Sequence, residues 1–142
     1  MKRLVTLMNE KNHYLEKFYS LNEKELPNFL TGNFDNLEGF YETRERILEV
    51  IKYIDAQIDE THRRDPAGAS GAGADLRRAV REALTIKDEY VGRIFEQDLQ
   101  VLSCIEAAKN GIIRELQDLK KGKRAVSGYR APNFVKRLDE EA

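Results

Sequence analysis

Two carboxylate and histidine pairs have a spacing that can serve a metal site. Glu10 precedes His13 by three residues, and Asp59 precedes His62 by the same step. Residues three apart on a helix project together, and Glu-x-x-His motifs supply ligands to di-metal helical bundles. Both members of the first pair, however, lie off the apolar positions of their segment, and His62 stands next to a glycine-rich stretch. We therefore interpret both pairs as solvated surface groups and expect no metal.

Other residues that can do chemistry also lack the companions that a reaction needs. Cys104, the only cysteine, lies in an apolar stretch and is interpreted as a small buried residue rather than a nucleophile. The segment around Arg44 and Arg46 resembles all-helical chorismate mutases, but only Arg44 lies near the apolar face, and such enzymes need several converging cations. The sequence has no glycine-rich phosphate loop and no Ser/His/Asp arrangement. We expect no catalytic residue, no enzyme activity and no cofactor.

The composition is typical of long amphipathic helices that bury a narrow stripe. Of the 142 residues, 35% are charged and 41% are hydrophobic, and the net charge is −1. A near-neutral chain has no overall field to select nucleic acid, so we expect no nucleic-acid partner. No stretch approaches the ~20 apolar residues that cross a bilayer, which predicts no membrane insertion and a cytoplasmic protein.

The first two helices are indicated by apolar residues that recur every three or four positions. The first runs from about Lys2 to Gly32, with a kink or break near residues 20–25 because of Pro27. The second begins at Asp35, which has capping-box spacing to Glu38, and ends near residue 62. The short turn between them predicts antiparallel neighbours.

A longer periodic stretch follows a low-complexity segment. Residues 65–74 contain glycines, alanines and a proline but no large apolar side chain, which predicts a flexible linker. From Asp75 to Lys121 the apolar period is sustained over roughly 70 Å at ~1.5 Å per residue. A restart at Gly111 would make two helices of this stretch. The sequence thus predicts an all-α, elongated antiparallel bundle of three helices, or four, over residues 1–121.

Residues 122–142 form a basic C-terminal tail that we expect to be mobile. Gly122, Gly128 and Pro132 interrupt any helix there, while cations surround Tyr129 and Phe134. Aromatic residues in a charged tail suit a short docking segment, because each can fill a partner pocket while the cations steer the encounter. The alternative is that Tyr129 and Phe134 fold back onto the bundle, and the two are compatible.

The chain resembles the FlgN/FliT-type flagellar export chaperones. The likeness rests on the first-helix register from Leu4 to Leu26, on the junction from Leu30 to Leu37 with the basic helix after it, and on the tail from Lys123 to Tyr129 followed by Phe134. The family implies a cytoplasmic helical chaperone that binds terminal helices of a late export substrate, a hook-associated or filament-cap protein. It also implies delivery to the membrane export gate, with Tyr129 and Phe134 as the gate-docking residues.

The apolar stripe of the last helix is the natural surface for a client helix, because two shorter helices cannot cover all of it. The expected client-binding face comprises Leu102, Ile105, Ile112, Leu116 and Leu119. The alternative is a structural coiled-coil protein or homodimeric adaptor, in which the same stripe pairs with a second copy.

Overall fold

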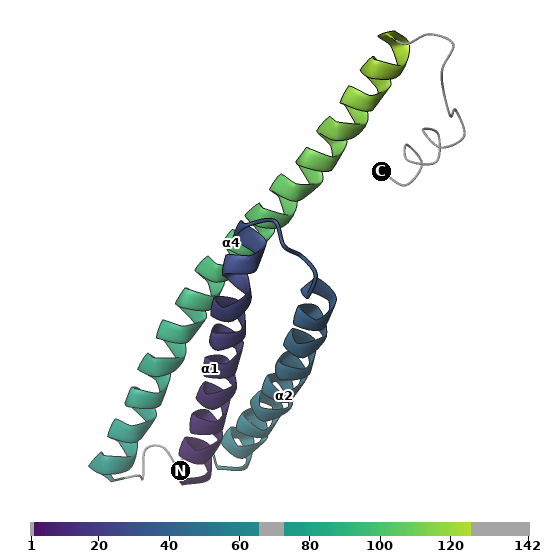
Figure 1. Cartoon of the computed structure of the whole chain (residues 1–142). Coiled ribbons are helices and arrows are strands. Elements are labelled where there is room, and N and C mark those ends of the chain that lie inside the picture. The colour runs from purple at the N-terminus through teal and green to yellow at the C-terminus, as the bar shows by residue number, and fades with distance from the viewer. Residues whose placement is uncertain (1, 66–72, 126–142) are drawn as a thin grey trace. The chain divides into compact units, whose positions relative to one another are not determined.

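The all-α prediction is confirmed by the computed structural model, which describes residues 2–65 and 73–125, with side chains through Gly122. Over these ranges the chain forms three helices and no strand: α1 (Lys2–Leu30), α2 (Leu37–Arg64) and α4 (Ala74–Ala125) (Figure 1). None of the helices in the described ranges combines the length and apolar character needed to cross a membrane. Residues 66–72 of the expected linker and the tail from residue 126 lie outside the described residues.

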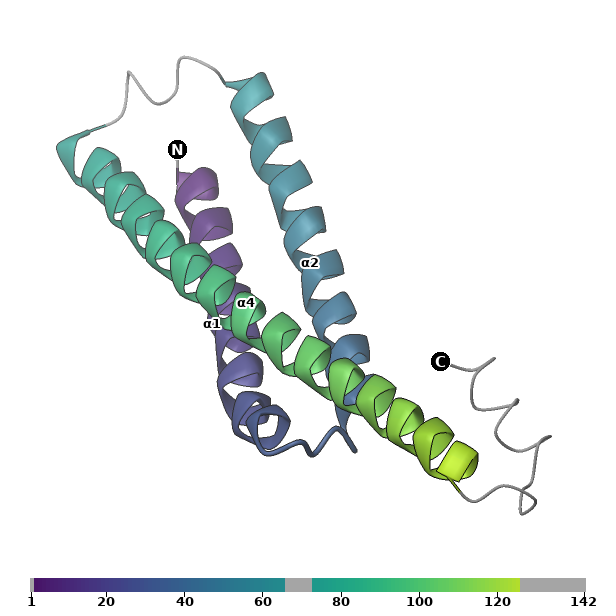
Figure 2. The same ribbon diagram turned by 90° about the horizontal axis from the view of Figure 1, so that it is seen from above.

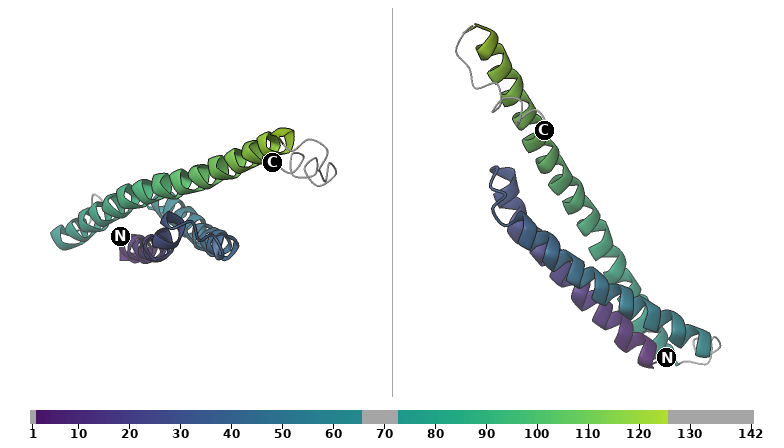
Figure 3. Two further views of the ribbon diagram at one scale, coloured as in Figure 1. Left: turned by 45° about the horizontal axis from the view of Figure 1, so that its top comes forward. Right: turned by 90° about the vertical axis from the view of Figure 1, so that its right-hand side faces the viewer.

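The chain divides into two compact units, Met1–Val101 and Leu102–Ala142. In the first unit, α1 and α2 run antiparallel and side by side (Figures 1 and 3). The N-terminal half of α4 packs against this pair, crossing α1 (Figure 2). The heart of the core is a cluster in which Tyr90 and Ile94 of α4 meet Leu15, Phe18, Ile47 and Ile51 of the other two helices.

A glycine closes α1 and turns the chain back. Gly32 has φ 83°, and the Asn33 and Gly32 amides donate to the Asn28 and Phe29 carbonyls at 2.8 and 3.1 Å. This is the Schellman pattern, which satisfies carbonyls that a helix end leaves free. The predicted end of the first helix near Gly32 is therefore confirmed. Aromatic rings fix the turn: Phe29 stacks on Phe34 at 5.4 Å and meets Phe40 edge-on at 5.1 Å.

Of the kink or break predicted near residues 20–25, the break is wrong, because α1 is continuous with Pro27 inside it. Pro27 lies in the last turn and is exposed, and its carbonyl still accepts a 3.3 Å bond from the Thr31 amide. Only one backbone bond is lost near the end of the helix, where the cost is smaller than in mid-helix. The surrounding turns are held by buried Asn22, Glu25 and Phe29.

The predicted capping box at Asp35 and Glu38 is also wrong. The N-cap of α2 is Asn36, and its side chain makes no capping hydrogen bond. Instead, Asn36 Nδ2 donates to Glu25 Oε1 at 2.8 Å, so a contact between helices replaces the local cap.

The last helix is single, which settles the choice between three helices and four. α4 runs through Gly92 and Gly111 and also through Gly122, which was expected to end it. A helical glycine costs only about 1 kcal/mol relative to alanine, less than the bonds of a long helix gain together.

Candidate functional site

The five expected client-binding residues all lie on α4 within the second unit. Leu102, Ile112 and Leu119 are more than half exposed, at 53%, 58% and 53%. Ile105 and Leu116 are intermediate. Steps of three, seven, four and three residues place the five on one side of the helix, with the spacing of a coiled-coil seam. The structure thus gives a row of large apolar side chains open to solvent.

The first unit carries further exposed apolar residues of α4, upstream of the five expected client-binding residues but within the helix that was expected to bind the client. Leu84, Val91 and Phe95 are 42%, 48% and 63% exposed. Leu84 and Val91 stand whole heptads before Ile105, Ile112 and Leu119, and Phe95 stands one heptad before Leu102. The signal that finds them is the period of seven rather than hydrophobicity alone.

Tyr129 and Phe134 lie outside the described residues, so their docking role stays a prediction. The two histidines are described and exposed, and His13 contacts the Tyr14 ring at 5.5 Å between centroids. Among the residues that the structure describes, no group of three or more His, Cys, Asp or Glu is placed to hold a metal. Cys104 is half-buried on α4.

Arg44 lies at the junction of all three helices. Its guanidinium carbon is 4.8 Å from the Phe18 ring centroid and 5.2 Å from that of Phe40, and Nη2 is 3.2 Å from Asp98 Oδ2. The side chain is only 16% exposed. Its charge is thus met by an internal carboxylate and by the electron-rich faces of the rings.

Asn22 extends this junction and is fully buried. Its Nδ2 donates to Gln97 Oε1 and to Asp98 Oδ1, both at 3.2 Å, and Gln97 Nε2 donates to the Tyr19 carbonyl at 3.2 Å. Because these polar partners meet in only one register, the hydrogen bonds fix the axial position of this part of α4 relative to the α1–α2 pair. We call Asn22, Arg44, Gln97 and Asp98 the polar junction.

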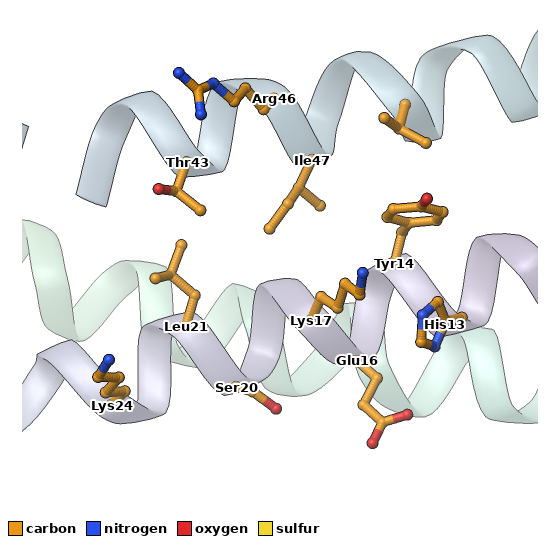
Figure 4. A pocket seen from close by; sticks show the side chains of 11 residues that line it. His13, Tyr14, Glu16, Lys17, Ser20, Leu21, Lys24, Thr43, Arg46 and Ile47 are labelled. Atoms are coloured by element: carbon orange, nitrogen blue, oxygen red, sulfur yellow. The ribbon is translucent and has the colours of Figure 1, made fainter. Parts of the chain in front are cut away.

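A groove of about 580 Å³ runs between α1 and α2 (Figure 4). In the figure Leu21, Thr43 and Ile47 point toward one another from the two helices, and Lys17 extends along α1 toward the ring of Tyr14. Lys24 lies on the α1 edge and Arg46 on the α2 edge. The groove lies on a different face from the α4 contact, because Asn12, Tyr19, Asn22 and Arg44, which hydrogen-bond to α4, do not line it. Its remaining lining residues are His13, Tyr14, Glu16, Ser20 and Val50.

Comparisons with known proteins return nothing: no family model, no curated protein and no solved structure matches the chain.

Proposed function

We propose that this chain is a helix-binding chaperone that shields an apolar helix of a client protein before the client assembles. The observation that carries the proposal is the solvent-exposed row Leu102, Ile105, Ile112, Leu116 and Leu119 on α4. Burying apolar surface is favourable by about 25 cal/mol per Å², so side chains that are half open gain from a covering partner. A second helix suits such a row, because knobs spaced by three and four fit the holes of a facing helix.

The resemblance to FlgN/FliT-type proteins supplies the client class. A hook-associated or filament-cap protein has terminal helices whose apolar stripes are uncovered until assembly, and a chaperone in the cytoplasm would prevent their premature polymerisation. Delivery to the export gate would then use Tyr129 and Phe134. Under this proposal the protein binds and releases a partner and makes no covalent change.

One observation favours a second candidate function, a homodimeric coiled-coil adaptor. Leu84, Val91 and Phe95 stand in the same heptad register upstream and are at least 42% exposed, with the register position between Val91 and Ile105 taken by Asp98 of the polar junction. A seam repeated in sevens over this length is typical of helices that pair with a copy of themselves. The same row would then be covered by a second chain rather than by a client.

Affinity capture with matched variants distinguishes the two functions. The bait is the purified full chain, incubated with an extract of a flagellated source organism, and captured proteins are identified by mass spectrometry. The test variant carries Leu102→Ser, Ile112→Ser and Leu119→Ser, all at exposed positions. The control carries Leu30→Ser, Leu48→Ser and Ile86→Ser, which are also exposed but do not belong to the row.

The chaperone function predicts that the natural chain and the control recover a hook-associated or cap protein, and that the test variant loses at least tenfold of it. Recovery of only the chain itself, with a dimer mass that the test variant reduces to a monomer, would establish the adaptor. Equal capture by all three baits would rule out the row as the binding surface.

A further inference from the structure

The groove between α1 and α2 contains cations that the chain itself does not neutralise. Lys17 and Lys24 are exposed, and neither forms an ion pair with any residue in the described part of the chain. Their neighbours three and four residues away on α1 are His13, Tyr14, Ser20, Leu21, Pro27 and Asn28, with no carboxylate among them.

The lining of the groove combines these charges with an apolar floor. Leu21 and Ile47 meet across it, and the ring of Tyr14 lies 5.0 Å beneath the Lys17 amine. Arg46 adds a cation on the α2 side, and Glu16 is the one acidic residue of the lining. Lys17, Lys24 and Arg46 against Glu16 give the lining a formal charge of +2, by subtracting one from three.

We propose that the α1–α2 groove docks an amphipathic helix of a partner protein, one whose apolar stripe is flanked by Asp and Glu. Lys17 and Lys24 at the α1 edge match carboxylates on one flank of such a helix, and Arg46, which stands between Glu42 and Glu49 on α2, offers one cation at the other edge. The partly buried side chains of Tyr14, Leu21 and Val50 receive its apolar stripe. The groove is a separate surface from the α4 row, because no groove residue belongs to α4.

The dimensions of the groove favour a helix over a small anion. The α1 lining extends from His13 to Lys24, eleven steps of ~1.5 Å, or about 17 Å and three turns. The four α1 residues at the exposed edge, His13, Lys17, Ser20 and Lys24, are spaced by four, three and four, which is the step of a helix-packing seam. A small anion would leave the apolar floor uncovered, whereas a helix covers floor and edges together.

A designed peptide pair tests the proposal on the full chain. The acidic probe is an 18-residue helical peptide with leucines on one face and glutamates on both flanks. The basic probe has lysine at every glutamate position, and a third peptide has the acidic composition scrambled so that no apolar face forms. Binding of each fluorescently labelled peptide is measured by anisotropy at low and at physiological salt.

Charge reversal provides the decisive variant. Lys17→Glu, Lys24→Glu and Arg46→Glu together reverse the cations of the groove. A control with Arg77→Glu, Arg78→Glu and Arg81→Glu makes the same change in net charge at exposed positions of α4. Circular dichroism and thermal unfolding establish that both variants are folded.

We expect the natural chain and the control to bind the acidic probe at least tenfold more tightly than the basic and scrambled probes. The groove variant should lose at least tenfold of that affinity and gain affinity for the basic probe. Equal loss in the groove variant and in the control would overturn the proposal, because binding would follow net charge alone. Loss of binding on changing Leu102, Ile112 and Leu119 would also overturn it, because the peptide would then occupy the α4 row.

Discussion

Arg44 Nη2 lies 3.2 Å from Asp98 Oδ2, and this ion pair joins α2 to α4 across 54 residues of sequence. Both side chains are partly screened from water, at 16% and 33% exposure. The pair is therefore stronger than a surface ion pair but does not carry the full desolvation cost of a deeply buried one. Arg44 gains further from the rings of Phe18 and Phe40.

Removing Arg44 should destabilise the protein. We expect Arg44→Ala to lower the free energy of unfolding by about 2 kcal/mol, because it leaves the Asp98 carboxylate without its charge partner and uncovers aromatic surface. Urea denaturation of the single variants and of Arg44→Ala with Asp98→Ala measures the coupling between the two side chains. Strictly additive losses would show that the ion pair contributes nothing.

The two buried asparagines of α1 should respond differently to the same substitution. Asn22→Leu should cost about 2–3 kcal/mol, because Gln97 and Asp98 lose a buried donor. Asn12→Leu should change stability by less than about 1 kcal/mol. Asn12 makes one side-chain bond, to the Ala83 carbonyl at 2.9 Å, whereas Asn22 donates to two side chains. The Oδ1 atoms of both asparagines are buried without a partner in the described structure, so the difference lies in the donated bonds. Denaturant midpoints of the two variants measure these losses of stability. Similar losses for Asn22→Leu and Asn12→Leu would contradict the expected difference between the two asparagines.

Two glycine-to-alanine changes should have opposite signs. Gly32→Ala should destabilise by about 1 kcal/mol, because its φ of 83° is costly for any residue with a β-carbon. Gly92→Ala should stabilise by up to about 1 kcal/mol, because Gly92 lies within α4 and alanine is the better helix former. An added β-carbon meets nothing within 4 Å at either site, so crowding does not confuse the comparison. Melting temperatures that move in the same direction would refute the backbone explanation.

Pro27→Ala should stabilise the protein by about 1 kcal/mol. The substitution gives residue 27 an amide that can donate within α1, and Pro27 is exposed, so no packing is lost. Thermal unfolding of the variant measures the gain. An unchanged or lowered melting temperature would mean that the rigidity of proline in the unfolded chain outweighs the recovered bond.

The period of 3.6 residues was enough to predict the helices and the centre of the core. Leu15, Phe18, Ile47 and Ile51 recur at helical spacing, and all four are buried together. Local signals failed at the start of α2, where a contact from another helix holds the side chain. The predicted cap was Asp35, but the N-cap is Asn36, whose Nδ2 donates to Glu25, and no pattern near Asn36 contains that information.

Which polar residues are buried could not be predicted from the sequence. Asn22 and Glu25 are 0% and 4% exposed, yet their polarity predicts a surface position. Asn22 donates to Gln97 and Asp98 of α4, while Glu25 accepts from Asn36 at the start of α2 and from Asn28 of its own helix. The α4 row was predictable from its spacing, whereas its partner, like the gate-docking role of Tyr129 and Phe134, stays a prediction.

The groove was missed for a different reason. In the sequence the groove is marked only by the lack of carboxylates three and four residues from Lys17 and Lys24. Missing residues form no recognisable motif. The antiparallel pairing of α1 and α2 then brings Arg46 to the same groove as these lysines.

The polar junction also has a consequence for how the chain emerges from the ribosome. Residues 2–64 form the α1–α2 hairpin, and they are synthesised before Gln97 and Asp98 exist. During that interval Asn22 and Arg44 can hydrogen-bond to water. The face of the hairpin that later contacts α4 is therefore partly hydrated and less prone to non-specific hydrophobic association. We expect amides of α1 and α2 to gain protection before those of α4 when the full chain refolds under pulsed hydrogen exchange. Simultaneous protection of all three helices would show that the α1–α2 hairpin does not form before α4 packs against it.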